Sequence, residues 1–305
     1  MLKDDLIDKC QRAWRVAAVT PAGHKYNLEI LKKYIYRDMD TGLIDEWQLW
    51  LNTDVPEDVD YIYQLEKECD KVRVCTLPEK MGHYVPAIAN YFKFANHLNT
   101  IYIRFDDDIC FIQDGAVKKL AEARLQNSWV NDPVLDYVLG TGSTPEPFVI
   151  CANIVNNFAV SAYHHDIGAL GESAGRQSPA LLDGTFCSAD FFELTHETFK
   201  TKLESGKLSD YYFPDAVLSQ YQPFSINCFA FFAKDLMFLT DLNDEPYIWG
   251  RGARKLGRPN MIKGDALVVH RAYGAQRGNI TEEAQAEWLD FYKRLSETPS
   301  AVIPS

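Results

Sequence analysis

The chain has 305 residues, of which 47% are hydrophobic and 24% are charged, a composition typical of a globular protein. Its formal net charge of −12 argues against general nucleic-acid binding and against attachment to anionic lipid, because both need a basic surface. Its seven cysteines include no Cys-x-x-Cys pair, so we expect neither a disulfide framework nor a zinc knuckle. Free cysteines fit a reducing compartment. We expect a cytoplasmic protein without a membrane span, since no apolar run approaches ~20 residues.

The first half of the chain alternates between predicted strands and helices. Short runs rich in β-branched and aromatic residues predict the strands, and apolar residues at helical spacing predict the helices between them. The strands are expected at residues 15–20, 47–53, 72–77 and 101–105, and the helices at about 28–35, 56–68 and 84–97. This order predicts an α/β fold with a parallel sheet and covering helices.

The second half of the chain is less regular. We expect a strand at 148–155, helices at 191–203, 245–256 and 284–295, a buried apolar segment at 226–232, and a turn and strand at 261–270. Residues 161–188 are rich in Gly, Ser, Ala and His and show no clear period, which predicts a lid or an acceptor loop. No repeat or linker divides the chain, so we expect a single domain over residues 1–305, with a loose tail at 297–305.

Three consecutive aspartates, Asp106, Asp107 and Asp108, follow the fourth predicted strand. Their charges repel one another, so a fold that gathers them needs a compensating cation, and strand-end carboxylates are suitable ligands for Mg²⁺ or Mn²⁺. Side chains alternate along an extended segment, so we expect Asp106 and Asp108 on one side and Asp107 on the other. A solvated acidic turn is the alternative. Thr20 and Asn52 also fall at predicted strand ends, where ligands of open parallel sheets bind.

Other polar residues could complete such a site. His270 ends a predicted strand, where a histidine is either structural or a metal ligand. Asp244 and Glu245 precede a predicted helix, where they could cap the helix or take a proton from an acceptor hydroxyl. A basic cluster could bind phosphate through charge-assisted hydrogen bonds or form a solvated helix face. It comprises Arg251, Arg254, Lys255, Arg258, Arg271 and Arg277.

The order of these segments resembles the GT-A superfamily of glycosyltransferases. Residues 104–109 resemble its DXD motif, residues 264–270 resemble the segment that brings a histidine to the same metal, and residues 244–251 resemble the acidic helix start that faces the acceptor. The resemblance implies a GT-A fold, with a Rossmann-like, mainly parallel sheet and helices on both faces. It divides the domain into a nucleotide-sugar-binding half at 14–125 and an acceptor-binding half at 126–296.

The resemblance also implies an activity and a set of site residues. The protein is expected to transfer a sugar from a nucleoside diphosphate sugar, with UDP favoured, to a hydroxyl of a glycan or another acceptor, as in polysaccharide biosynthesis. The implied ligands of Mn²⁺ or Mg²⁺ are Asp106, Asp108 and His270, with Asp108 the more direct. Glu245 is implied to be catalytic, with Asp244 as its competitor. The implied donor-binding residues are Thr20, Pro21, Asn52, Thr53, Arg104, Asp106 and Asp107.

Three other kinds of protein could account for parts of this pattern. A haloacid-dehalogenase-type phosphohydrolase also has Asp-x-Asp at a strand end, but there the motif ends the first strand. A sugar-nucleotide pyrophosphorylase would show a glycine-rich loop after the first strand, and residues 20–23 contain one glycine. A non-catalytic, divalent-dependent protein that binds glycans or nucleotide-sugars stays open, and hydrolysis of a nucleotide-sugar would distinguish it from an enzyme.

Overall fold

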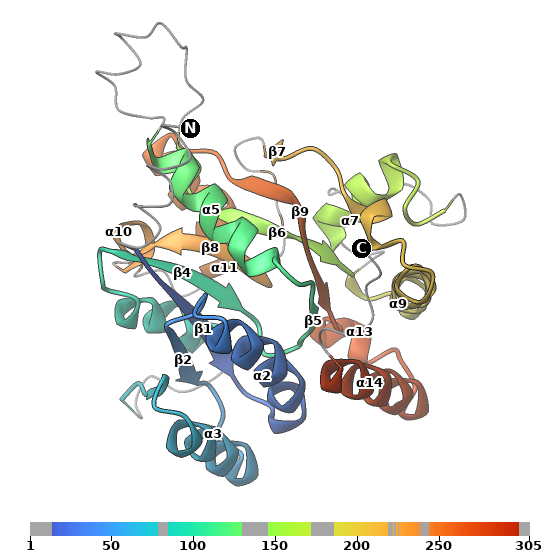
Figure 1. The fold of residues 1–305 in the computed structure, drawn as a ribbon, viewed down its shortest axis with the longest axis horizontal. Helices are drawn as coiled ribbons and strands as arrows, with labels where there is room; N and C mark the ends of the chain where they lie inside the picture. The colour runs from blue at the N-terminus through green and yellow to red at the C-terminus, as the bar shows by residue number, and fades with distance from the viewer. Residues whose placement is uncertain are drawn as a thin grey trace, which may run out of the picture.

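The computed structural model describes residues 14–78, 85–129, 146–171, 186–218, 226–237 and 244–298, together with positions 222, 224 and 239. These residues contain a nine-stranded sheet in the order β3-β2-β1-β4-β8-β6-β9-β5, with β7 paired to β9 (Figure 1). The strands are β1 (Arg15–Ala22), β2 (Glu46–Leu51), β3 (Val72–Cys75), β4 (Thr100–Phe105), β5 (Ile109–Ile112), β6 (Ile150–Val155), β7 (Ala216–Val217), β8 (Cys228–Phe232) and β9 (Met261–His270).

The sheet combines the predicted parallel strands with antiparallel ones. β3, β2, β1 and β4 are parallel neighbours, as the alternation of strands and helices predicts. β8 runs antiparallel to both β4 and β6, and β5 runs antiparallel to β9. The whole sheet is therefore mixed, and the expectation of a mainly parallel sheet holds for the N-terminal half.

Helices connect the parallel strands and also close the chain (Figure 1). Pro56 stands in the first turn of α3, where its missing N–H costs nothing, and Glu57 and Asp58 in the same turn face the positive end of the helix dipole. The helices are α2 (Lys25–Asp40), α3 (Pro56–Glu68), α4 (Val85–Ile88), η2 (Ala89–Phe94), α5 (Ala116–Trp129), α7 (Phe158–Asp166), α9 (Ala189–Glu204), η4 (Leu208–Tyr211), α10 (Ala233–Leu236), α11 (Asp244–Pro246), η5 (Tyr247–Arg251), α12 (Gly252–Leu256), α13 (Gly274–Arg277) and α14 (Glu282–Glu297).

Helices cover both faces of the sheet, as two tryptophans of β2 show. Trp47 and Trp50 are three residues apart, so their side chains point to opposite faces of the strand. Trp47 packs against Tyr36 of α2, with ring centroids 6.2 Å apart. Trp50 packs against Tyr91 and Phe92 of η2 at 5.8 and 5.1 Å. Both tryptophans are completely buried, so each face of β2 belongs to the hydrophobic core.

The first part of the expected lid at 161–188 is helical. α7 continues to Asp166 and is capped by Asn157, whose Oδ1 accepts hydrogen bonds from the backbone N–H of Ala159 and Val160 at 3.1 and 3.2 Å. For residues 161–166 the expectation of a loop was wrong, because α7 is buried on several sides and a helix without a polar face shows no amphipathic period. Residues 172–185 lie outside the described part of the chain.

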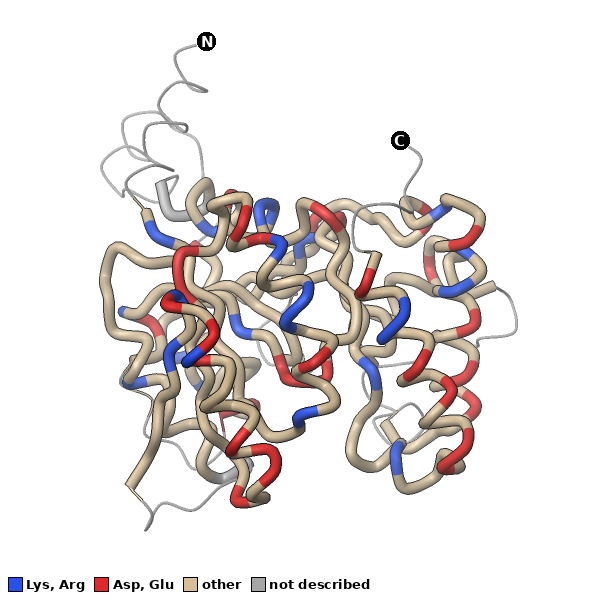
Figure 2. The backbone as a smooth tube through the Cα atoms, turned by 60° about the horizontal axis from the view of Figure 1, so that its bottom comes forward, with Lys and Arg blue, Asp and Glu red and all other residues tan. Residues whose placement is uncertain are grey.

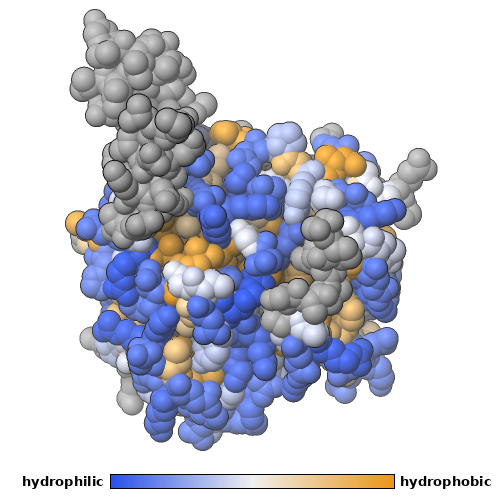
Figure 3. Space-filling view, in the orientation of Figure 1, coloured by the Kyte–Doolittle hydropathy of each residue, from blue (hydrophilic) through white to orange (hydrophobic). Residues whose placement is uncertain are grey.

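The surface agrees with the acidic composition. Asp and Glu recur along the whole described backbone, with Lys and Arg between them (Figure 2). The face drawn in Figure 3 is mostly hydrophilic, with hydrophobic residues in small areas. Within the described segments, no helix is both long enough and apolar enough to cross a membrane.

Candidate active site

A cavity of about 370 Å³ lies where the carboxyl ends of the parallel strands meet the end of β9. In open α/β sheets this edge is the usual place for a ligand. Strands β4 and β9 end close to each other near α13 (Figure 1). Of the donor-binding, metal-binding and catalytic residues proposed from the sequence, all except Thr20 line this cavity, namely Pro21, Asn52, Thr53, Arg104, Asp106, Asp107, Asp108, Asp244, Glu245 and His270.

Thr20 lies in the core beneath the cavity. Its side chain is completely buried, and its hydroxyl accepts a hydrogen bond from Nε1 of Trp47 at 3.0 Å. β1 continues past Thr20 to Ala22, so the strand end that reaches the cavity is Pro21 rather than Thr20. The structure therefore does not place Thr20 where it could touch a donor.

Asp107 points toward the turn between β1 and α2. Its Oδ2 accepts hydrogen bonds from the backbone N–H groups of Gly23 and His24 at 3.0 and 2.9 Å and lies 3.0 Å from Nδ1 of His24. This hydrogen bond raises the pKa of His24. A Cβ at position 23 would lie 3.3 Å from the same oxygen, so glycine permits the close approach. Asp107 thus joins the end of β4 to the end of β1.

Asp108 faces His270 and Arg277. Its Oδ2 lies 3.4 Å from Nε2 of His270 and 3.3 Å from Nη1 of Arg277. Burial raises the pKa of the Asp108 carboxyl, but the nearby His270 and Arg277 outweigh it and hold this pKa below its usual range. Burial lowers the pKa of His270, but the carboxylate of Asp108 raises it by more, so the pKa of His270 lies above its usual value. The structure thus brings together a carboxylate and an imidazole that lie 162 positions apart in the sequence (270 − 108).

Arg104 forms a buried ionic bridge at the other side of the cavity. Its guanidinium lies 2.8 Å from Oδ1 of Asp106 and 2.5 Å from Oδ2 of Asp244. Nδ2 of Asn227 donates to the second oxygen of Asp106 at 3.0 Å. Burial raises the pKa of Asp106 to about 6, although Arg104 opposes the shift. Asp106 and Asp244 are therefore held by partners of the fold itself.

Glu245 has a pKa that suits a general base. Burial raises its pKa to about 7, and the neighbouring charges of Asp244 and Asp106 add to the shift. A general base works best when its pKa lies near the operating pH. The Asp244 carboxylate is engaged by Arg104, so Glu245 is the better candidate of the two.

The donor set is compatible with a divalent cation that shares its ligands with a substrate. Within the described residues no group of three or more His, Cys, Asp or Glu side chains is placed to hold a metal by itself. Asp108 and His270 offer one carboxylate and one imidazole side by side. Mg²⁺ and Mn²⁺ commonly take their remaining ligands from phosphate and water. Asp106 is less accessible as a direct ligand, because Arg104 and Asn227 already use both of its oxygens.

Several residues of the cavity were not expected from the sequence. Asn227, Phe186 and Tyr273 line it, and the rings of Phe186 and Tyr273 lie 4.8 Å apart. A single Asn next to an apolar run is a weak signal that a sheet edge is polar. Of the basic cluster that the sequence offered for phosphate, Arg277 lines the cavity and the other members do not.

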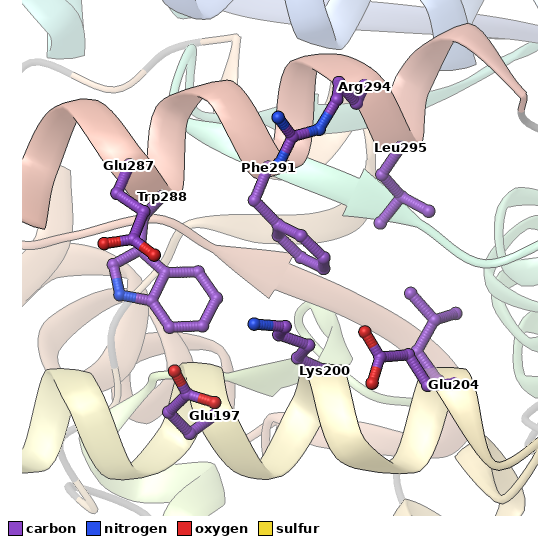
Figure 4. Close-up of a pocket in the computed structure, with 9 residues that line it drawn as sticks. Glu197, Lys200, Glu204, Glu287, Trp288, Phe291, Arg294 and Leu295 are labelled. Atoms are coloured by element: carbon purple, nitrogen blue, oxygen red, sulfur yellow. The ribbon is translucent and has the colours of Figure 1, made fainter.

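A second cavity, of about 400 Å³, lies between α9 and α14 and contains none of the predicted site residues. Figure 4 shows the rings of Trp288 and Phe291 facing Lys200 across this cavity. Nζ of Lys200 lies 5.8 Å from the centroids of both rings. The contacts are those of two packed surface helices, so the cavity at the strand ends remains the candidate active site.

Comparisons with known proteins leave the family open. A scan against protein-family models finds no match, and a search of curated proteins finds none either. Among solved structures, the inositol-1-phosphate CTP transferase from T. maritima resembles this chain with a TM-score of 0.42 and 11% sequence identity, over 92% of this chain and 97% of that one. The function proposed below therefore rests on the cavity and its residues.

Proposed function

We propose that this protein is a metal-dependent glycosyltransferase of the GT-A type, which transfers a sugar from a nucleoside diphosphate sugar to a hydroxyl acceptor. One observation carries the proposal: Asp108 after β4, His270 at the end of β9 and Glu245 in α11 line one cavity. This set would supply two metal ligands and a base. The UDP donor and the identity of the acceptor as a glycan are parts of the proposal that follow from the resemblance alone.

Asp108 and His270 would hold Mn²⁺ or Mg²⁺, and Asp106 would reach the ion through water. When bound, the ion supplies charge that stabilises the departing diphosphate. Arg277 lies 3.3 Å from Asp108 with its side chain 29% exposed, so it can turn to a phosphate oxygen. A guanidinium binds phosphate through paired, charge-assisted hydrogen bonds.

The other end of the cavity would bind the nucleoside. Pro21, Asn52 and Thr53 line it beside the carboxyl ends of β1 and β2. Asp107 fixes the turn after β1 through the N–H groups of Gly23 and His24, so its part in donor binding would be to shape this wall. Arg104 would keep Asp106 and Asp244 in place rather than contact the sugar, because its guanidinium is buried between them.

Glu245 would accept the proton of the acceptor hydroxyl. Its raised pKa of about 7 leaves a large deprotonated fraction at neutral pH and matches the requirement for a base. The donor is already activated by its diphosphate, so positioning and a single proton transfer are the main tasks of the protein.

Isothermal titration calorimetry with UDP, GDP and CMP in the presence of Mn²⁺ tests the donor, and release of the nucleoside diphosphate from a panel of nucleotide-sugars tests the reaction. Metal-dependent binding of a nucleoside diphosphate together with sugar transfer or slow hydrolysis is expected. Binding without either reaction would favour the non-catalytic binding protein. No binding by any of the three nucleotides would remove the proposal.

A further inference from the structure

Asn156 lies directly after β6 in a backbone conformation that few residues adopt. Its φ angle is 56°, and among the described residues it is the one non-glycine residue with a positive φ. This left-handed region is costly for most side chains, and asparagine tolerates it better than most. The residue is also completely buried. Such conformations persist where the surrounding structure enforces them and are frequent at functional sites.

This conformation presents the backbone carbonyl of Asn156 to His270. Nδ1 of His270 lies 3.1 Å from that carbonyl oxygen, whereas Nε2 lies 3.4 Å from Oδ2 of Asp108. A carbonyl oxygen only accepts hydrogen bonds, so this shorter contact favours a proton on Nδ1, and the lone pair of a neutral imidazole with that proton is on Nε2. Histidine ligands of metals are commonly oriented by such a hydrogen bond on their other nitrogen.

The side chain of Asn156 is itself held by hydrogen bonds to the segment that follows His270. Its Nδ2 donates to the backbone oxygen of Arg271 at 3.0 Å and to Oε1 of Gln276 at 3.1 Å. Its Oδ1 accepts from Nε2 of Gln276 at 3.1 Å. Gln276 is completely buried in α13, so the paired amides connect the end of β6 to the helix that follows His270.

We infer that Asn156 is a positioning residue, whose left-handed backbone fixes His270 in the Nδ1-protonated tautomer so that Nε2 faces Asp108 and a divalent cation. The inference rests on the proposed function, because it concerns the proposed metal ligand. It separates two tasks of Asn156. The backbone sets the tautomer of His270, and the side chain stabilises the backbone.

Two substitutions separate these tasks. Asn156→Gly removes the side chain but keeps the positive φ available, because glycine adopts this region without steric cost. Asn156→Ala disfavours the region and is expected to turn the carbonyl away from His270. Asn156→Ser disfavours it less and gives the same comparison in a milder form if the alanine variant does not fold.

Long-range ¹H–¹⁵N correlation spectra of the metal-free protein at about pH 9 report the tautomer, and loss of the signal in His270→Gln assigns it. The Nδ1–H form is expected in the native protein and in Asn156→Gly, and a mixture with the Nε2–H form in Asn156→Ala or Asn156→Ser.

Binding of Mn²⁺ with a nucleoside diphosphate should weaken about 10- to 100-fold in the alanine or serine variant and clearly less in Asn156→Gly. An Nε2–H tautomer in the native protein, or one tautomer in all variants, would overturn the inference. Absence of Mn²⁺ binding by the native protein would instead count against the proposed function, while the tautomer result would stand by itself.

Discussion

Replacing Arg104 with methionine tests whether the buried guanidinium is needed to hold two carboxylates in the cavity. Arg104 lies 2.8 Å from Asp106 and 2.5 Å from Asp244. Methionine keeps much of the apolar part of the side chain and removes the charge. The variant therefore leaves two carboxylates close together without their shared counterion, and we expect it to be less stable than the native protein.

The size of the loss follows from the burial of the two partners. Removing one partner of a buried ion pair costs about 3–5 kcal/mol, because the other charge is left uncompensated. The Asp244 side chain is 4% exposed, whereas that of Asp106 is 24% exposed and contributes less because solvent screens it. We therefore expect a loss of about 4 kcal/mol. An unfolding entropy of roughly 2.1 cal/mol/K per residue over 305 residues converts this loss to a melting temperature lower by about 6 °C.

Differential scanning calorimetry of the native and variant proteins at about pH 8 and pH 5.5 measures the effect. Without Arg104 the folded carboxyls have raised pKa values, so the variant loses stability as pH rises, and its deficit should be smaller at the lower pH. Arg15→Met is the matched control. It breaks an ion pair with Glu46 in which the arginine side chain is 50% exposed, so less than about 1 kcal/mol is expected. Equal shifts for the two variants, or a larger Arg104→Met deficit at pH 5.5, would refute the reasoning.

Three further predictions concern the cavity and the core. Transfer should fall about tenfold per pH unit below the Glu245 pKa of about 7. Glu245→Gln should lower transfer by ~10² or more at unchanged donor affinity, and full transfer by this variant would exclude Glu245 as the base and make Asp244 the next carboxylate to test. Asp108→Asn should abolish Mn²⁺-dependent nucleotide binding in calorimetry, and native-like binding would exclude Asp108 as a ligand. Burial lowers the pKa of His196 to about 3, so the unfolded chain takes up a proton first as pH falls below about 6.5. The stability advantage of the native protein over His196→Asn should therefore shrink by about 2 kcal/mol between pH 7 and pH 5, and an unchanged difference in urea unfolding would contradict this.

The parallel half of the sheet could be predicted because its signals are local. Pro56 and the apolar period after it predict the bounds of α3 correctly. Side-chain alternation after β4 also predicts that Asp107 points away from its neighbours, and it contacts Gly23 and His24. The predicted end of β1 was two residues too early, because Pro21 suggests a turn. A proline at the end of a strand gives up few hydrogen bonds, so β1 continues to Ala22. This difference places Pro21 rather than Thr20 in the cavity.

The antiparallel strands and the partners of the site could not be predicted in the same way. β8 inserts between β4 and β6, and no local pattern specifies which strand a later segment will pair with. The direction of Arg104 depends on Asp244, which is 140 positions away. The conformation of Asn156 leaves no trace in composition or periodicity, because asparagine adopts negative φ angles far more often than the positive one found here.

The charges of the cavity form two groups with different chemical tasks. One group consists of side chains that pair with one another through buried and partly buried contacts, so it needs no ligand and gives the cavity a fixed wall. Its members are Arg104, Asp106, Asn227 and Asp244. Asp108 instead meets His270 and Arg277 at 3.4 and 3.3 Å, which is longer than a good charge-assisted hydrogen bond. A cation bound at Asp108 would gain a close carboxylate and release Arg277 toward a phosphate. The position of the loose contacts, rather than the number of carboxylates, therefore distinguishes Asp108 from Asp106 as the residue expected to bind the metal.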